Sequence, residues 1–242
     1  MRTALFQEAF SKVFRQEDVS APTYAFWDPI IVAKLDPCPD VPGMISIKKQ
    51  RLLNLAFGLI PENEAYLEVG TFQGKSLISA MLGNPLRPAF ACDNFTQFEG
   101  NTFATAQGHL ERYGLLDKIQ FYNCDFRDIY TPASLPVPVG LYFYDAGHDY
   151  QSQYLAIKLV ERYLADEALV IVDDWRFAPD SQSRAKEATI AAAEESTHDW
   201  ELLLDLPARF NGDRAMWWNG VGVLAFRRQK VDATAAPDAP QS

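Results

Sequence analysis

Between residues 66 and 172, short apolar segments alternate with longer segments of helical periodicity, and this alternation limits the possible folds more than any other feature. The apolar segments are 66–69, 89–92, 119–122, 139–144 and 169–172. The segments with helical spacing between them include 75–82, 102–113 and 150–164. Nearly continuous apolar strands have both faces buried, unlike the alternating strands of a half-exposed sheet. The pattern therefore predicts an α/β protein with a doubly wound parallel sheet and right-handed crossovers.

The flanking segments extend this core at both ends. Helical spacing predicts a first amphipathic helix over 3–17, and six Pro and Gly residues with several aromatic residues indicate an ordered loop over 20–44. Ser46 is expected to cap a helix that ends at Leu59, before Pro61. Another helix is expected over 182–197, followed by strands 200–206 and 221–227 that form an antiparallel hairpin at one sheet edge. The expected units are N-terminal helices with a lid loop (1–60), the main domain (61–228) and a disordered tail (229–242).

Charge and composition narrow the classes of partner. The chain has 242 residues, 22 Lys and Arg against 32 Asp and Glu, and a net charge of −10. That charge repels phosphate backbones, so we expect no nucleic-acid partner and favour a small-molecule substrate. Neither a signal peptide nor an apolar stretch of membrane-spanning length is evident, which predicts a cytoplasmic protein without a membrane partner. The three cysteines do not suggest a disulfide framework.

The segment YLEVGTFQGKS, residues 66–76, contains the most informative turn. Gly70 permits a tight turn after the first strand, and Gly74 permits close backbone approach at the start of a helix. This position, at the carboxyl end of a parallel strand, is where doubly wound sheets bind ligands. The turn lacks the middle glycine of the pyrophosphate-binding pattern and has a carboxylate, Glu68, beside it. It therefore disfavours a dinucleotide and suits a cationic amino-acid ligand.

Two further acids follow the next strands. Asp93 ends the second strand and could accept hydrogen bonds from both ribose hydroxyls of a nucleoside. Asp125 follows the third strand and could accept from an adenine amino group. An adenosine that carries an amino-acid tail and no phosphate is S-adenosylmethionine (SAM).

This layout resembles the class I SAM-dependent methyltransferases, from about residue 66 to residue 227. The resemblance implies a Rossmann-like sheet of seven strands in the order 3-2-1-4-5-7-6, with strand 7 antiparallel. It also implies a set of cofactor-binding residues around the methionine tail, the ribose and the adenine. These are Glu68, Gly70, Thr71, Phe72, Gly74, Lys75, Ser76, Asp93, Asn94, Cys124, Asp125 and Asp145.

A second group of acids ends strands four and five. Asp145, Asp173 and Asp174 should converge, because these strands are expected to be neighbours. Three carboxylates in one crevice require a cation or protons, and oxygen ligands suit Mg²⁺. The pattern resembles the metal site of catechol and macrocin O-methyltransferase-like enzymes, with Asp174 where the catechol enzyme has Asn. At the position of that enzyme's lysine base stands His148, which together with Asp145 is a candidate catalytic residue.

The sequence thus predicts Mg²⁺-assisted O-methylation of a hydroxyl on a sugar or natural product, with several alternatives left open. The acids could only cap and hydrogen-bond, which would make the enzyme metal-independent. The chain could also resemble antibiotic-tailoring proteins described as hydroxylases, or be a non-catalytic SAM- or nucleoside-binding module. Tyr24 and Trp27 in the lid loop are expected to exclude water, and two groups are expected to line the acceptor pocket. These are Trp175, Arg176 and Phe177, and Trp217, Trp218 and Asn219. The apolar first helix could pack on its own domain or form a homo-oligomer.

Overall fold

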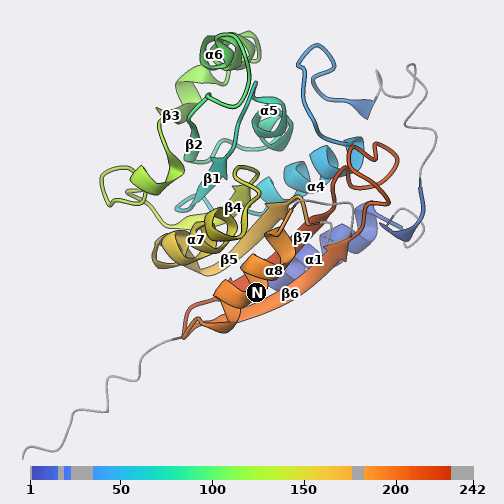
Figure 1. Ribbon diagram of the computed structural model, residues 1–242, viewed down its shortest axis with the longest axis vertical. Helices are drawn as coiled ribbons and strands as arrows, with labels where there is room; N and C mark the ends of the chain where they lie inside the picture. Colours follow the sequence, from blue (N-terminus) through green and yellow to red (C-terminus); the bar gives the residue numbers. More distant parts are fainter. Residues whose placement is uncertain (1, 16–18, 23–34, 176–182, 230–242) are drawn as a thin grey trace, which may run out of the picture.

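The computed structural model describes residues 2–15, 19–22, 35–175 and 183–229. Its centre is a seven-stranded sheet in the order β3-β2-β1-β4-β5-β7-β6, which confirms the expected topology (Figure 1). The strands are β1 (Ala65–Val69), β2 (Ala89–Asp93), β3 (Ile119–Asn123), β4 (Val139–Tyr144), β5 (Leu164–Asp173), β6 (Asp199–Leu206) and β7 (Val221–Arg227). The first five are parallel, whereas β7 runs antiparallel to both β5 and β6. The hairpin expected at one edge is therefore β6–β7, with β6 outermost.

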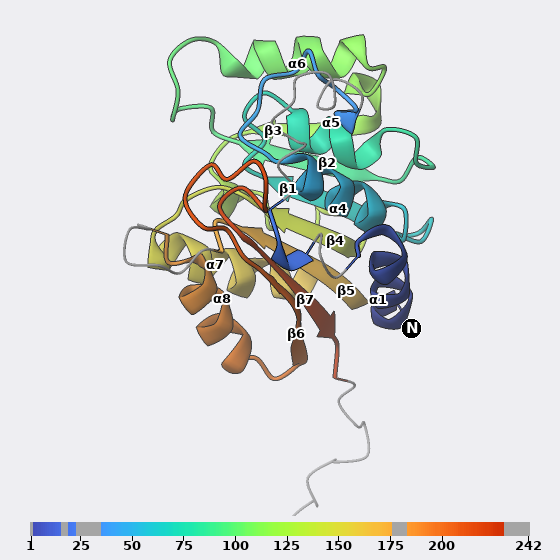
Figure 2. The ribbon, with the colours of Figure 1, turned by 90° about the vertical axis from the view of Figure 1, so that its right-hand side faces the viewer.

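Helices cover both faces of the sheet, as Figure 2 shows. They are α1 (Arg2–Val13), α4 (Ile47–Phe57), α5 (Lys75–Met81), α6 (Thr102–Arg112), α7 (Tyr150–Val160) and α8 (Ala185–Glu194). One core includes apolar side chains of α1, α4 and α5 against the sheet. The other core joins α7 and α8 to the opposite face. The two cores take alternate residues of each strand, because successive side chains point to opposite faces. Hence Leu169 and Ile171 of β5 face α1 and α4, whereas Val170 and Val172 face α7 and α8.

Several strand and helix boundaries differ from expectation, most of all at the start of β5; α1 ends at Val13 instead of residue 17, and α8 is shorter than the expected 182–197. Helix α7 ends at Val160, not at Leu164, and β5 begins at Leu164, not at Leu169. The early part of β5 contains Asp166 and Glu167, which hide it from a search for apolar runs. Backbone pairing overrides that composition, since Glu167 and Ala168 pair with Arg227 and Phe226 of β7.

No helix in the described ranges has the length and apolarity needed to cross a membrane. The three cysteines are all free thiols, as expected. The expected lid residues Tyr24 and Trp27, the pocket residues Arg176 and Phe177, and tail residues 230–242 lie outside the described residues.

Candidate functional site

The carboxyl ends of β1, β2 and β4 are joined at Gly70, directly after β1. Its backbone N–H donates to the Cys92 carbonyl oxygen at 2.8 Å, and the Asp145 N–H donates to the Val69 carbonyl oxygen at 2.8 Å. Gly70 has φ +91°, and a Cβ there would lie 1.8 Å from the Asp145 carbonyl oxygen. Only glycine satisfies both restrictions, so this residue allows the two strand ends to approach each other.

Asp93, at the end of β2, lies where the sequence predicts it and also holds the turn. Its Oδ2 accepts hydrogen bonds from the backbone N–H groups of Thr71 (2.9 Å) and Phe72 (2.8 Å), and Oδ1 accepts from Phe95 N–H (2.7 Å). An ionised carboxylate has about four acceptor positions, so these three bonds do not exhaust it. The side chain also lines the cavities described next, where further donors can reach it.

Two adjoining cavities of about 240 and 250 Å³ open at this edge of the sheet, and Gly70, Asp93, Gln97 and Asp145 line both. The first extends toward β3 and is lined by several predicted adenosine-binding residues, which are Asn94, Cys124 and Asp125. The second extends toward β5 and combines apolar side chains with acids. Its described lining includes Met44, Phe72, Phe95, Phe98, His148, Asp173, Asp174, Trp218 and Asn219.

Two of the predicted cofactor-binding residues, Glu68 and Ser76, are buried next to the Gly70 turn and line neither cavity. Glu68 is fully buried and accepts hydrogen bonds from Tyr66 Oη (2.6 Å) and Ser76 Oγ (2.8 Å). Burial raises the pKa of Glu68 to about 8, although both hydrogen bonds oppose the rise. Glu68 and Ser76 therefore form a buried hydrogen-bonded group between β1 and α5.

Lys75 also points away from both cavities. Its Nζ donates to Asp36 Oδ2 (2.6 Å) and to the carbonyl oxygens of Cys38 (3.0 Å) and Val41 (2.9 Å). Three acceptors satisfy the three donors of an ammonium group. Lys75 thus attaches the 36–41 segment to the start of α5, where Gly74 adopts the left-handed conformation with φ +89°.

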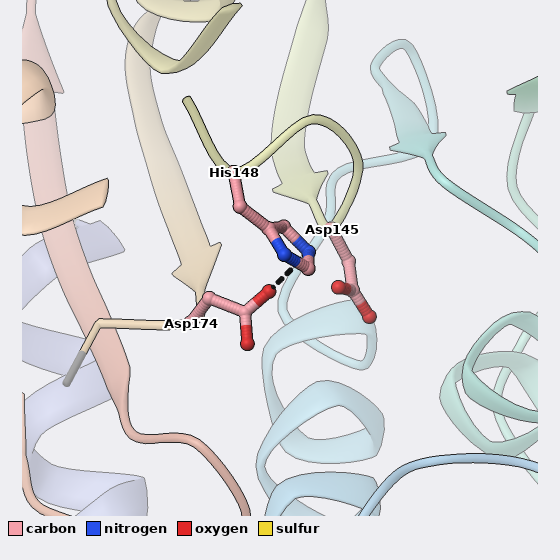
Figure 3. Close-up of side chains that lie close together, drawn as sticks. All are labelled: Asp145, His148 and Asp174. Atoms are coloured by element: carbon pink, nitrogen blue, oxygen red, sulfur yellow. Dashed lines mark ion pairs between the residues drawn. The ribbon is translucent and has the colours of Figure 1, made fainter. Parts of the chain in front are cut away.

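The ends of β4 and β5 bring together Asp145, His148 and Asp174, which we call the rim cluster (Figure 3). One ligand atom from each of these residues lies within 4.8 Å of the other two. His148 Nε2 lies 2.6 Å from Asp174 Oδ2. Because a carboxylate only accepts hydrogen bonds, His148 carries a proton on Nε2 in this contact. Asp149, the residue after His148, caps α7 by accepting a hydrogen bond from Ser152 N–H at 2.9 Å.

Neighbouring charges set the protonation of the rim cluster. The hydrogen bond with Asp174 raises the pKa of His148, although burial opposes it. Burial alone would raise the pKa of Asp174, but the hydrogen bond and charge of His148 hold it below its ordinary value. Burial and the neighbouring acids Asp173 and Asp174 raise the pKa of Asp145 well above its usual range. Asp145 is therefore the acid of the group that most needs a compensating positive charge.

Asp174 is held by its own backbone and by Asn219. It adopts a left-handed φ of +52°, which is uncommon outside glycine and turns the chain sharply after β5. Asn219 Nδ2 donates to Asp174 Oδ1 at 2.5 Å, while Asn219 Oδ1 accepts from Gly212 N–H at 2.7 Å. With Oδ1 engaged by Asn219, Oδ2 is the oxygen left to face His148.

Asp173 is partnered differently from the other two acids. It is 3% exposed and forms an ion pair with the fully buried Lys49 of α4. Its Oδ1 also accepts from the Asp174 N–H at 2.7 Å. Of the three acids expected from sequence to bind metal (Asp145, Asp173 and Asp174), Asp173 thus already has a cationic partner at Oδ1, and it lines the second cavity together with the other two.

The rim cluster has a donor set that suits a divalent ion. Octahedral ligands at about 2.1 Å from a metal lie roughly 3–4 Å from one another, in keeping with atoms that all fall within 4.8 Å. Two carboxylates and an imidazole are a less typical ligand set for Mg²⁺ than oxygen ligands alone. Mn²⁺ and Zn²⁺ also accept such a mixed set of oxygen and nitrogen ligands.

The expected aromatic walls are only partly present. Trp175 is 2% exposed and packs in the core with α7 and α8, so the expectation that it lines the pocket is wrong. Trp217 is fully buried in the other core and does not line the cavity either. Trp218 and Asn219 do line the second cavity, as expected.

Sequence reasoning did not identify several residues that line the second cavity, nor Lys49, which pairs with Asp173. Met44, Phe95 and Phe98 follow no strand-end motif, so a search for motifs passes over them. Lys49 lies in a polar Lys-Lys-Gln run that would ordinarily be placed on a solvent-exposed face, yet all three residues are buried. The one available signal was strand parity, which places Asp173 on the same face as Ile171 and hence toward α4.

Residues 67–175 match a family model described as a methyltransferase domain. No curated protein matches the sequence significantly. The matched segment contains the Gly70 turn, Asp93 and the whole rim cluster.

Several solved structures share the fold over nearly the whole chain. TomG from Streptomyces achromogenes, an O-methyltransferase involved in tomaymycin synthesis and solved with SAM, is 18% identical with a TM-score of 0.56, covering 93% of this chain and 96% of its own. An O-methyltransferase from Bacillus cereus in complex with SAH is 15% identical with a TM-score of 0.57, covering 93% and 97%. Cofactor-bound Rv0187 from MTB is 20% identical with a TM-score of 0.57, covering 90% and 96%. At these identities, the likeness shows a common fold.

Proposed function

We propose that this chain, whose residues 67–175 match a methyltransferase domain, is a SAM-dependent methyltransferase that methylates a hydroxyl oxygen of a small molecule at the rim cluster. The observation that carries this proposal is the position of Asp145, His148 and Asp174. They line or border a cavity that adjoins the Gly70 turn. A methyltransferase with a group that can accept a hydroxyl proton beside the cofactor site is suited to oxygen acceptors.

The cofactor would occupy both cavities. Asn94, Cys124 and Asp125 would border the adenine in the first cavity, and Asp93 would accept from the ribose. Gly70, Thr71, Phe72 and Asp145 would surround the methionine end. The sulfonium and amino groups of SAM are cationic, and the acids at this edge provide a complementary negative field.

His148 would act as the general base. Its Nε2–H is directed at Asp174, which leaves Nδ1 as the nitrogen that can accept a proton. The acceptor oxygen forms a bond to the methyl carbon as the sulfur–carbon bond breaks, giving a methyl ether and SAH. The hydroxyl proton passes to Nδ1, and Asp174 stabilises the resulting imidazolium by charge. Positioning of the oxygen in line with the methyl group supplies much of the rate.

A divalent cation, with Mg²⁺ as the ion expected from sequence, would be held by Asp145 and Asp174, while His148, whose Nε2–H is directed at Asp174, would remain the base and not become a ligand. Such an ion lowers the pKa of a bound hydroxyl and favours its ionised form. Asp145, whose burial and acidic neighbours disfavour its charge, would be the residue most stabilised by it. His148 cannot coordinate through Nε2 and hold Asp174 through Nε2–H at once.

A metal-independent reaction at the same residues is a second candidate, and one observation favours it. Lys49 already compensates Asp173, and the His148–Asp174 pair forms a base without any ion. In this form of the reaction, Asp145 would stay protonated and hydrogen-bond the acceptor.

Incubation with ¹³C-methyl SAM and a panel of phenols and glycosides tests both candidates. We expect an NMR methyl signal in the methoxy range from at least one acceptor class. Loss of turnover in EDTA with recovery in Mg²⁺ or Mn²⁺ would support the cation, whereas full turnover in EDTA would support the metal-independent form. His148→Gln should lower turnover at least tenfold with little change in SAH affinity. Methylation only of nitrogen or sulfur acceptors would contradict the proposed function.

A further inference from the structure

Lys75, the first residue of α5, holds a segment of the chain that ends at the second cavity. Besides its hydrogen bonds to residues 36–41, its stem lies against Gly43, where a Cβ would come within 2.7 Å of the Lys75 Cβ and Cδ. The Lys75 and Asp36 side chains are only 9% and 7% exposed. Because separating them would leave two uncompensated buried charges, this ion pair opposes any movement of the segment away from α5.

Met44, the residue after Gly43, is where this segment reaches the second cavity. We call residues 36–44 the strap, and Met44 is the strap residue that lines that cavity, together with Phe72 and Phe98. Met44 is 49% exposed, so its own packing contributes little to its position. Ser46 then caps α4, which fixes the chain after Met44. The position of Met44 therefore depends on how the strap is held at Lys75.

The strap should stay folded without the Lys75 ammonium. Cys38 and Val41 are buried in the core that includes α4 and α5. Cys38 N–H also donates to Asp36 Oδ1 at 3.0 Å, and Val41 N–H donates to the Cys38 carbonyl oxygen at 3.1 Å. Loss of the ammonium should consequently displace the strap and its last residue, Met44, without unfolding the chain.

The Gly70 turn does not depend on the Lys75 side chain. At the start of α5, Gly74 N–H donates to the Thr71 carbonyl oxygen at 2.8 Å, and Ile78 N–H donates to the Gly74 carbonyl oxygen at 2.9 Å. These are backbone bonds, and the Lys75 side chain lines neither cavity. A change of this side chain should therefore leave the cofactor-binding turn in place.

We propose that Lys75 is a positioning residue for the acceptor, which acts through the strap to place Met44 in the wall of the second cavity and does not bind the cofactor. The resemblance to SAM-dependent methyltransferases implies the opposite role, at the methionine end of SAM, so the two assignments predict different variants. The inference rests on the proposed function where it concerns the acceptor, whereas the position of Met44 can be measured without one.

Lys75→Met removes the ammonium and keeps a stem of similar length. We expect its affinity for SAH, measured by calorimetric titration, to stay within threefold of the wild type. In spectra of the ¹³C-methyl-methionine protein, the Met44 signal, identified by its loss in Met44→Leu, should shift in K75M. The signal of Met216, which is buried on the β6–β7 connection, should not move.

Gly43→Ala disturbs the same contact while the ammonium remains. The added Cβ would overlap the Lys75 stem, so the strap must move away from α5, and the Met44 signal should shift again with SAH affinity within threefold. Gly108→Ala is the matched control, because a Cβ at Gly108 of α6 would meet nothing within 4 Å. It should leave the Met44 signal where it is.

Any acceptor found in the panel of phenols and glycosides allows a kinetic test. Lys75→Met should raise the KM for that acceptor at least fivefold and keep kcat within threefold, since a lost contact that the substrate and transition state share raises KM alone. Met44→Ala should have a similar effect. In the Met44→Ala background, Lys75→Met should add less than twofold, because two residues that act through one contact are not additive.

Three results would overturn the inference: a tenfold loss of SAH affinity in Lys75→Met, an unmoved Met44 signal in both Lys75→Met and Gly43→Ala, or KM effects that multiply in the double variant. If Lys75→Met fails to fold by circular dichroism, Gly43→Ala decides by the same measurements. If no acceptor in the panel is methylated, the proposed function fails by itself, and SAH affinity and the Met44 signal still decide the role of Lys75.

Discussion

Position 70 leaves no room for a side chain, because the Gly70 backbone lies against the Asp145 carbonyl. We predict that Gly70→Ala lowers the free energy of unfolding by more than about 3 kcal/mol, since the added Cβ overlaps backbone that cannot move without separating β1 from β4. Urea denaturation followed by circular dichroism measures this.

Gly83→Ala is the matched control. Gly83 also has a positive φ, +74°, but a Cβ there would meet nothing within 4 Å. Gly83→Ala should therefore lower the free energy of unfolding by only roughly 1–2 kcal/mol, which is the cost of placing an alanine in the left-handed conformation. Equal losses for the two variants would show that the β1–β4 contact is not as tight as described.

At the scale of elements, α4 is connected to the end of β5, next to the rim cluster, through the ion pair of Lys49 with Asp173. Its N-cap bond from Lys49 N–H to Ser46 Oγ fixes the turn that carries this lysine. We predict that Ser46→Ala lowers the free energy of unfolding by about 1 kcal/mol. Ser11→Ala, at an exposed serine of α1 whose hydroxyl donates to the Gln7 carbonyl oxygen, should change it by less than about 0.5 kcal/mol. A loss from Ser46→Ala no larger than this would contradict the capping role.

The sequence was sufficient for elements whose composition and geometry agree. The apolar runs that became β1 to β4 predicted the parallel sheet, and the glycine turn with Asp93 predicted where its strand ends meet. The resemblance, not the periodicity, supplied the strand order. The beginning of β5 was missed because its polar Asp166 and Glu167 are placed by pairing with β7, a contact distant in sequence.

The partners of individual site residues were harder to predict, because these contacts too join residues that are distant in sequence. That Asp145 and Asp174 lie together follows from neighbouring strands, and this was expected. That Lys49 reaches Asp173, or that Lys75 binds the 36–41 segment, depends on where helices pack on the sheet. Conventional placement of lysine at the surface gives the opposite expectation. The roles of the individual site residues stay predictions.

At the scale of the whole molecule, the buried Glu68 should give the stability a pH dependence. Its folded-state pKa of about 8 lies above the ordinary value of 4.5. The folded state therefore retains a proton that the unfolded state releases, so this contribution to stability falls as the pH rises from about 4.5 to about 8 and then levels off.

Glu68→Gln removes that titration and keeps the side-chain shape. We predict that its unfolding free energy declines less steeply than that of the wild type between pH 5 and pH 8, with a difference of a few kcal/mol accumulated by pH 8. Thermal and urea unfolding at pH 5, 6.5, 8 and 9 measure it. Parallel pH profiles for the two proteins would rule out a protonated Glu68.

The assignment of the whole molecule rests on SAM binding where β1, β2 and β4 end, and calorimetric titration with SAH tests this most directly. We predict one SAH bound per chain, an affinity at least tenfold weaker in Asp93→Asn, and an unchanged affinity in Asp117→Asn, an exposed aspartate outside both cavities. A folded wild-type protein that binds no SAH, or an Asp93→Asn variant that binds as tightly as the wild type, would contradict the account.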